Sequence, residues 1–264
     1  MSNAATIHDW TRVDAGIWHS FHLQWIAEIN KELNGGVLPA PYYALAEPQG
    51  GFTVEEGAAG DRGTTGGPST EPRRFEADLL ALHESDEAAD GGVLLADAAP
   101  RVRLTAPLTP SPPGARRIAV RYGSADRIVA LIELVSPGNR DGRAKATAFC
   151  NKVEAAILAG VHVLMIDLFP SNPLLPTGMH GAVAERFGVE YRPPDGEPLT
   201  CASYRAAESA TTSFVEPLRV GAAPPVMPLF LSRTRYVELP LADSYAAAFA
   251  ATPRKYREAL EPAT

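Results

Sequence analysis

The sequence predicts an α/β protein whose core is a mixed β-sheet flanked by helices. Three observations favour this class. Two β-rich runs at 118–122 and 127–135 are separated by a turn-sized gap, which is typical of a hairpin. A helical segment at 143–159 is followed by a nearly continuous apolar strand at 161–168, which indicates a parallel crossover. Helical patterns also open and close the chain.

The first helix is expected to begin after Asp14, which is a plausible N-cap. Asn34-Gly35-Gly36 is expected to end this helix. His19 and His22 lie beside the apolar stripe, either as packing residues or, less usually, as metal ligands at i and i+3. The stripe itself consists of large side chains at helical spacing: Trp18, Phe21, Trp25, Ile29 and Leu33.

The next part of the chain combines two short predicted strands with long polar stretches. Residues 42–47 form one strand, and residues 75–83, with Asp78 inside an apolar run, form another. The stretches at about 50–72 and 84–115 are rich in Gly, Pro, Ala and Thr, which indicates loops. We therefore predict a single domain over residues 1–264 with loop insertions at these two places.

The middle of the chain has the clearest pattern. Strands at 118–122 and 127–135 pair as a hairpin through the turn at 123–126. Residues 136–140 (SPGNR) are predicted as a loop, and Gly160 as the end of the helix at 143–159. The apolar run at 161–168 is expected to be buried on both faces of the sheet.

The last hundred residues have a weaker pattern. Residues 204–207 and 213–220 are predicted strands, and 223–231 is a Pro-rich stretch without an assigned element. Residues 241–250 and 253–260 are predicted as closing helices.

Composition limits the possible functions. The chain has 45% hydrophobic residues, a net charge of −7 and no basic run, so strong attraction to nucleic acid over the whole surface is not expected. Two cysteines do not make a disulfide scaffold. The N-terminus does not have a signal-peptide pattern and no apolar run spans a bilayer, so we expect a cytoplasmic protein without a membrane segment. Phosphate-loop, dinucleotide-binding, serine-hydrolase and HExxH motifs do not occur in the sequence.

Two acids lie in predicted strands where burial needs a partner. Asp78 and Glu133 both have apolar neighbours, and an uncompensated carboxylate there is costly. Mg²⁺ is one such partner, because it takes oxygen ligands from one or two carboxylates, waters and phosphates. The alternative is an ion pair between Glu133 and a nearby arginine, Arg140 or Arg143.

The segment that follows Glu133 carries a resemblance to a known family. The run from Ile132 to Asn139, the pair Gly142-Arg143, Lys152 in a helix, and the run from Gly160 to Leu168 occur in this order. They resemble the domain-of-unknown-function family four-zero-five-eight, as does the stretch 9–47 near the N-terminus. That family is similar to the Uma-two-type proteins of the PD-(D/E)xK nucleases, so the resemblance implies a restriction-endonuclease-like core.

The resemblance also implies roles for individual residues. Asp78 matches the first acid, Glu133 the second, and Lys152 a lysine displaced into the following helix; Asp78 and Glu133 are then the metal ligands. Val135 stands where the short ExK motif has its lysine, and Ala77 where the motif has proline. Possible accessory residues are Glu47, Ser136, Asn139, Arg140 and Arg143.

Three hypotheses follow. The first is a Mg²⁺-dependent nuclease that hydrolyses phosphodiester bonds. The second is a catalytically degenerate fold that binds nucleic acid or protein, and the third is an accessory protein without either activity. Lys152 alternatively covers apolar surface with its stem, and the sequence carries no signal for an oligomeric state. A phosphate-facing rim, with a solvated charged face as its alternative, would use Arg73, Arg74, Arg140, Arg143 and Lys145.

Overall fold

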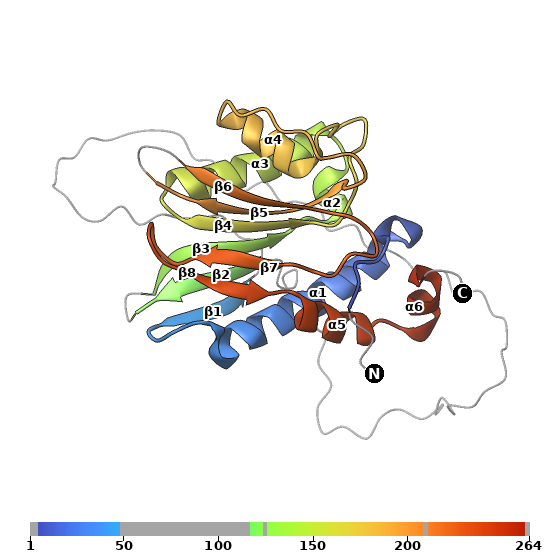
Figure 1. Cartoon of the computed structure of the whole chain (residues 1–264), viewed down its shortest axis with the longest axis horizontal. Helices are drawn as coiled ribbons and strands as arrows, with labels where there is room; N and C mark the ends of the chain where they lie inside the picture. The colour runs from blue at the N-terminus through green and yellow to red at the C-terminus, as the bar shows by residue number, and fades with distance from the viewer. Residues whose placement is uncertain (1–4, 48–116, 124–125, 208–210, 262–264) are drawn as a thin grey trace, which may run out of the picture. The chain divides into compact units, whose positions relative to one another are not determined.

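A computed structural model of the chain describes residues 5–47, 117–123, 126–207 and 211–261. These residues build a six-stranded mixed sheet in the order β1-β2-β3-β4-β5-β6, with helices on both faces (Figure 1). Neighbouring strands are antiparallel except for β3 and β4, which are parallel. The strands are β1 (Tyr42–Glu47), β2 (Arg117–Tyr122), β3 (Arg127–Leu134), β4 (His162–Asp167), β5 (Leu199–Arg205) and β6 (Thr212–Leu218).

The N-terminal stripe packs as predicted. A short 3₁₀ turn (Trp10–Arg12) precedes α1 (Ala15–Glu32), whose buried side chains contact one face of the sheet. The prediction that Asn34-Gly35-Gly36 ends the helix is confirmed, because α1 ends at Glu32 and the backbone of Gly36 is no longer helical. The chain continues through a π-helical turn, Leu33–Val37, in which Gly36 has a φ of 139°. Glycine adopts this backbone conformation without steric cost, so the chain can turn away from the helix axis at Gly36.

The central prediction is confirmed. β2 and β3 form an antiparallel hairpin, and α3 (Arg143–Leu158) connects β3 to the parallel strand β4. All six residues of β4 are buried, as expected for a strand covered on both faces. The predicted loop at 136–140 is instead a one-turn helix, α2 (Pro137–Arg140), which a capping box between Ser136 and Asn139 stabilises.

The C-terminal part contains elements that the sequence pattern missed. Helix α4 (Gly178–Arg186) and the two-stranded ribbon β7 (Val226–Phe230) and β8 (Tyr236–Pro240) had no predicted counterpart. The predicted strand at 204–207 is the end of a longer one, β5, whereas 213–220 corresponds to β6. The closing helices are confirmed as α5 (Ala242–Ala250) and α6 (Arg254–Leu260).

Two apolar clusters lie on opposite faces of the sheet. One cluster joins α1 and α5 to the sheet, and the other joins α3 and α4 to it (Figure 1). The predicted class, a mixed sheet flanked by helices, is therefore confirmed, while the restriction-endonuclease-like core stays a prediction. The predicted insertions at about 50–72 and 84–115 and the strand at 75–83 lie outside the described residues. Within the described ranges, none of the helices has both the length and the hydropathy that a bilayer crossing requires.

Candidate functional site

Glu133 lies near the end of β3 on the sheet face that α3 covers. Side chains alternate along a strand, so Glu133 shares its face with Leu131 and Val135, which belong to the cluster under α3. Its side chain is 3% exposed. A carboxylate buried to this extent needs a compensating group.

Lys152 supplies that group from α3. Its Nζ lies 2.7 Å from Glu133 Oε2, and its side chain is 18% exposed. The amine also lies 4.7 Å from the centroid of the Phe149 ring, a cation–π contact within one turn of the same helix. The crossover from β3 through α3 thus brings together two of the three predicted catalytic residues. The partner of Glu133 is Lys152 rather than Arg140 or Arg143, which the sequence had left as alternatives.

Charged residues form a row across three strands at this position. In the strand register Glu47 of β1 is opposite Arg117 of β2, and Arg117 is opposite Glu133 of β3. Arg117 Nη2 donates to Glu47 Oε2 at 3.1 Å, and Arg121 also binds the Glu47 carboxylate. The predicted accessory residue Glu47 is therefore part of the same row, but two arginines already hold its oxygens.

Sequence reasoning missed Arg117. It lies at the opposite end of the hairpin from the turn, so its pairing with Glu133 could have been found by counting residues back from that turn. The register shift between Val120 and Arg121 makes this count uncertain by one residue. A one-residue shift would place Arg117 on the other face of the sheet.

The row contains buried polar atoms that lack a hydrogen-bond partner among the described residues. They are Glu133 Oε1 and the Nε and Nη1 atoms of Arg117. Leaving such atoms unpaired costs about 1–3 kcal/mol each. This carboxylate oxygen of Glu133 can accept a hydrogen bond and these nitrogens of Arg117 can donate one, so both can bind a water molecule or a polar group of a ligand.

A pocket of about 210 Å³ lies beside Glu133. We call it the Glu133 pocket. Its lining combines the first half of α1 with the end of β3 and the start of α2, and it includes Trp18, whose buried Nε1 has no acceptor among the described residues. His19 and His22, which the sequence suggested as packing residues or ligands, both line it, with ring centroids 6.4 Å apart. The other lining residues are Ala15, Leu134, Ser136, Pro137, Gly138 and Asn139.

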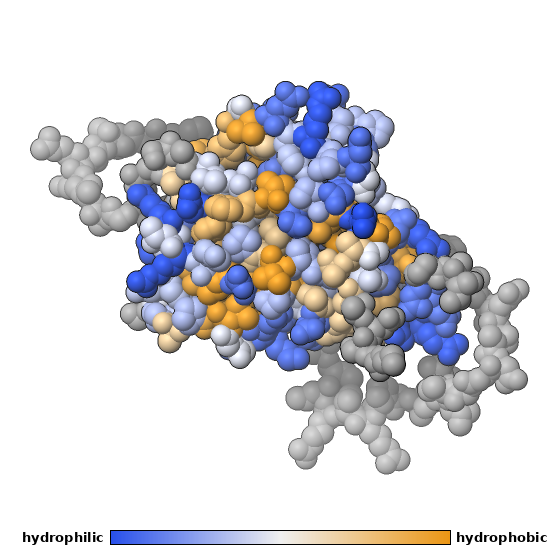
Figure 2. Space-filling view, viewed as in Figure 1, coloured by the Kyte–Doolittle hydropathy of each residue, from blue (hydrophilic) through white to orange (hydrophobic). Residues whose placement is uncertain are grey.

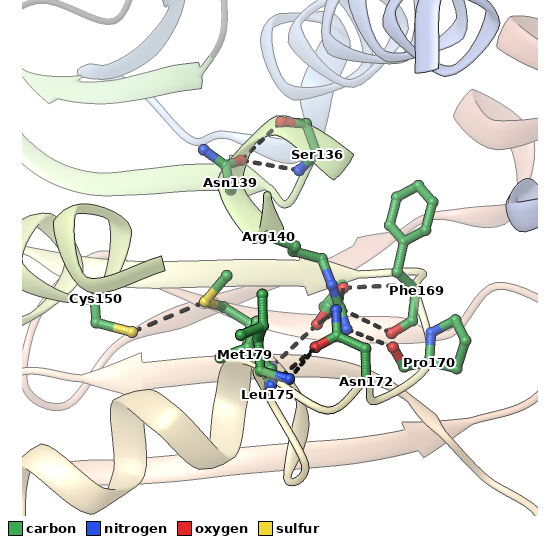
Figure 3. Close-up of polar contacts among 11 residues, drawn as sticks. Ser136, Asn139, Arg140, Cys150, Phe169, Pro170, Asn172, Leu175 and Met179 are labelled. Atoms are coloured by element: carbon green, nitrogen blue, oxygen red, sulfur yellow. Dashed lines mark hydrogen bonds and ion pairs between the residues drawn. The ribbon is translucent and has the colours of Figure 1, made fainter. Parts of the chain in front are cut away.

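The predicted accessory residues Ser136 and Asn139 serve the turn itself. Ser136 donates to Asn139 Oδ1 through both its backbone N–H and its hydroxyl, each at 2.9 Å (Figure 3). They shape the wall of the Glu133 pocket, but this Asn139 oxygen is already occupied as an acceptor. Arg143 is exposed at the first position of α3.

Arg140 contradicts its predicted place on a phosphate-facing rim. It is buried, and its Nη1 lies 2.7 Å from both carboxylate oxygens of Asp167. It also donates to the backbone carbonyls of Phe169 and Pro170, toward which it points in Figure 3. Burial raises the pKa of Asp167, and the arginine opposes that effect. Arg140 therefore neutralises an internal acid.

Lys145 of the predicted rim is exposed on α3, and its Nζ pairs with Asp141 Oδ2 at 2.8 Å. Three further predicted residues lie outside the described residues. These are Asp78, the other predicted metal ligand, and Arg73 and Arg74 of the predicted rim. Within the ranges that the structure covers, no group of three or more His, Cys, Asp or Glu side chains is arranged to hold a metal ion. Of the two predicted Mg²⁺ ligands, Asp78 and Glu133, only Glu133 has surroundings that the structure describes.

The chain matches no protein-family model, no curated protein and no solved structure. The resemblance to the domain-of-unknown-function family therefore stays a prediction, and the functional argument depends on the site itself.

Proposed function

We propose that the protein is a Mg²⁺-dependent phosphodiesterase that acts on nucleic acid, with Glu133 and Lys152 at its centre and Asp78 as the second acid. The observation that supports this proposal is the state of the Glu133 carboxylate. One oxygen accepts from Lys152 at 2.7 Å, while the other is buried without a partner among the described residues. A lysine beside a half-satisfied carboxylate suits electrostatic stabilisation of a phosphate.

The residues present fit a magnesium ion in part. Glu133 Oε1 is a hard oxygen donor without a partner in the described ranges, and Mg²⁺ is commonly held by one or two carboxylates together with waters and phosphate oxygens. Glu133 would hold the ion, with Asp78 as the further ligand. When bound, the ion would lower the pKa of a coordinated water and offset negative charge on the phosphate.

The chain's own groups have separate tasks in this proposal. Lys152 keeps a positive charge 2.7 Å from the Glu133 carboxylate, where it stabilises charge that grows on a phosphate oxygen. The Phe149 ring and the Glu133 carboxylate fix the position of the amine, so little reorganisation is needed during the reaction. In this proposal, a substrate bound in the Glu133 pocket would contact His19 and His22, which line it.

The test is a hydrolysis assay with Mg²⁺ on single- and double-stranded DNA and RNA. Removing one stabilising group of this kind typically lowers kcat by about 10²–10³-fold. We expect losses of that size for Glu133→Gln, Lys152→Met and Asp78→Asn. The matched control is the surface pair on α1, Glu28→Gln and Lys31→Met, which has the same chemistry at 3.2 Å and should retain full activity. Unchanged hydrolysis in Glu133→Gln, in a folded protein, contradicts the proposal.

One observation favours the second hypothesis, a degenerate fold that binds nucleic acid or protein. The carboxylate of Glu47, the other acid in the charged row, is already held by Arg117 and Arg121. A row in which acids are matched by arginines and lysine can be purely structural. Absence of hydrolysis on all four substrates, together with retained binding that Glu133→Gln does not change, would support this reading instead.

A further inference from the structure

A second pocket, of about 610 Å³, lies between the β6 edge of the main sheet and the β7–β8 ribbon. We call it the aromatic pocket. Its volume is within the range of small-molecule sites. It shares no lining residue with the Glu133 pocket. Ser203 on β5 donates to the Pro228 carbonyl of β7, which fixes the ribbon against the sheet and keeps the pocket between them.

Three aromatic side chains form one wall. The ring centroids of Phe214 and Phe230 are 4.9 Å apart, and those of Phe230 and Tyr236 are 5.6 Å apart. Phe230 is buried, whereas Phe214 and Tyr236 are 37% and 55% exposed. The outer rings therefore present apolar faces on which another flat ring can stack.

Arg205 brings a positive charge into this aromatic wall. Its guanidinium carbon lies 5.6 Å from the Phe214 centroid and 5.8 Å from the Phe230 centroid. Its only hydrogen bond from a terminal nitrogen within the described ranges goes to Thr212 Oγ1, at 3.2 Å, and no described carboxylate pairs with it. The stacked rings hold the guanidinium in place while leaving it without a counter-ion in those ranges.

A second arginine side chain lies in the lining of the aromatic pocket. Arg233, in the turn between β7 and β8, also lines the aromatic pocket. Burial and the positive charges of Arg205 and Arg233 lower the pKa of His162, a neighbour of Phe230, to about 4. Glu238 is the one acid among the described residues that line the pocket. On the face drawn in Figure 2, hydrophobic and hydrophilic side chains are interspersed over β6, β7 and β8.

We infer that the aromatic pocket binds a small molecule that consists of a planar ring carrying an anionic group. The ring would stack on Phe214 and Tyr236, and the anionic group would receive hydrogen bonds from Arg205, whose planar fork suits carboxylates and phosphates. Glu238 would accept from an amino group on the ring edge. Nucleoside monophosphates and aryl carboxylates both combine a planar ring with an anionic group, and only those with an amino group on the ring would also bind Glu238.

Saturation-transfer NMR and calorimetric titration of the whole 264-residue chain test the inference. The probes are the four common nucleoside monophosphates, adenosine as an uncharged counterpart, 1-naphthoate as an aryl carboxylate, and 1-naphthol as its uncharged counterpart. We expect saturable binding of at least one anionic probe with a Kd below about 1 mM. Its uncharged counterpart should bind at least tenfold more weakly. Binding of a nucleoside monophosphate would indicate a phosphate ligand, and binding of 1-naphthoate would indicate a carboxylate ligand.

Two variants locate the binding. Arg205→Met keeps an apolar stem against the rings but removes the charge, and Phe214→Ala removes one exposed ring. Each should weaken the anionic probe at least tenfold, while Arg192→Met, a control at a 79% exposed arginine, should not change it. Thermal unfolding confirms that each variant is folded. Failure of all anionic probes to bind, equal binding of charged and uncharged probes, or no effect of either variant would overturn the inference.

Discussion

Removing one partner from the buried pair of Arg140 and Asp167 should destabilise this domain severely. The Asp167 side chain is 2% exposed and that of Arg140 is 5% exposed. If Arg140 is replaced by methionine, the hydrogen bonds that the carboxylate keeps from described residues are two of 3.2 Å, donated by the backbone N–H groups of Phe169 and Met179. Removing one partner of a buried pair typically costs about 3–5 kcal/mol. Because a domain is stable by only about 5–15 kcal/mol, this loss is severe.

A double-mutant cycle measured by urea denaturation isolates this effect. Arg140→Met should lower the free energy of unfolding by about 3–5 kcal/mol. Adding Asp167→Leu removes the acid that was left alone, and should restore part of that loss. The control is the exposed pair of Arg254 and Glu258, 3.0 Å apart, whose removal should cost no more than about 1 kcal/mol. If Arg140→Met costs no more than Arg254→Met, the argument for an internal counter-ion is refuted.

Two further predictions concern helix α4. Burial lowers the pKa of His180, which contacts the Tyr204 hydroxyl at 2.6 Å, from 6.5 to about 4. As pH falls, the histidine of the unfolded chain therefore takes up a proton before the buried one does. The stability that His180 contributes is complete above pH 6.5 and is lost toward pH 4. Between pH 7 and pH 5 this contribution falls by about 2 kcal/mol. In urea titrations at both pH values, His180→Gln should lose about 2 kcal/mol less than the wild type over this interval, and an equal loss would be inconsistent with a buried neutral imidazole. Separately, a Cβ on Gly181 would lie 2.3 Å from Cβ and Oγ1 of Thr177, so Gly181→Ala should destabilise by about 1–3 kcal/mol although alanine favours helices. Gly16→Ala on α1, where nothing lies within 4 Å, should be neutral or slightly stabilising in the same assay, and equal effects at the two positions would argue against the overlap.

The parts of the fold that the sequence predicted well are those with strong local patterns. The stripe on α1, the β2–β3 hairpin and the apolar strand β4 each combine a clear period with a clear boundary. Helix α4 was missed because its buried residues, among them Met179, His180 and Val183, do not follow one narrow apolar stripe. Strand β7 was missed because Pro228 argues against a strand, whereas β7 pairs with only one partner, β8.

The candidate site was predictable to a similar degree. The pairing of Glu133 and Lys152 could be anticipated because both belong to one β3–α3–β4 crossover, where chain connectivity sets their separation. The role of Arg140 could not be anticipated. Its partner Asp167 lies in the next strand, and a single charged residue in a predicted loop does not indicate whether its side chain points into the core or into solvent. The aromatic pocket was not foreseen, because its rings come from β6, β7 and β8, and two of these strands were not recognised.

The register of β1 and β2 has a consequence for how this chain tolerates change. Glu47 and Arg117 are neighbours across the two strands, and an ion pair of 3.1 Å joins their side chains. Glu47 is the last residue of β1 and Arg117 is the first of β2, so this ion pair joins the two strands at the point where residues 48–116 are inserted in the sequence. Since the entropy of closing a loop grows only slowly with its length, changes in the length of this segment that keep Asp78 should cost the pairing of β1 and β2 little.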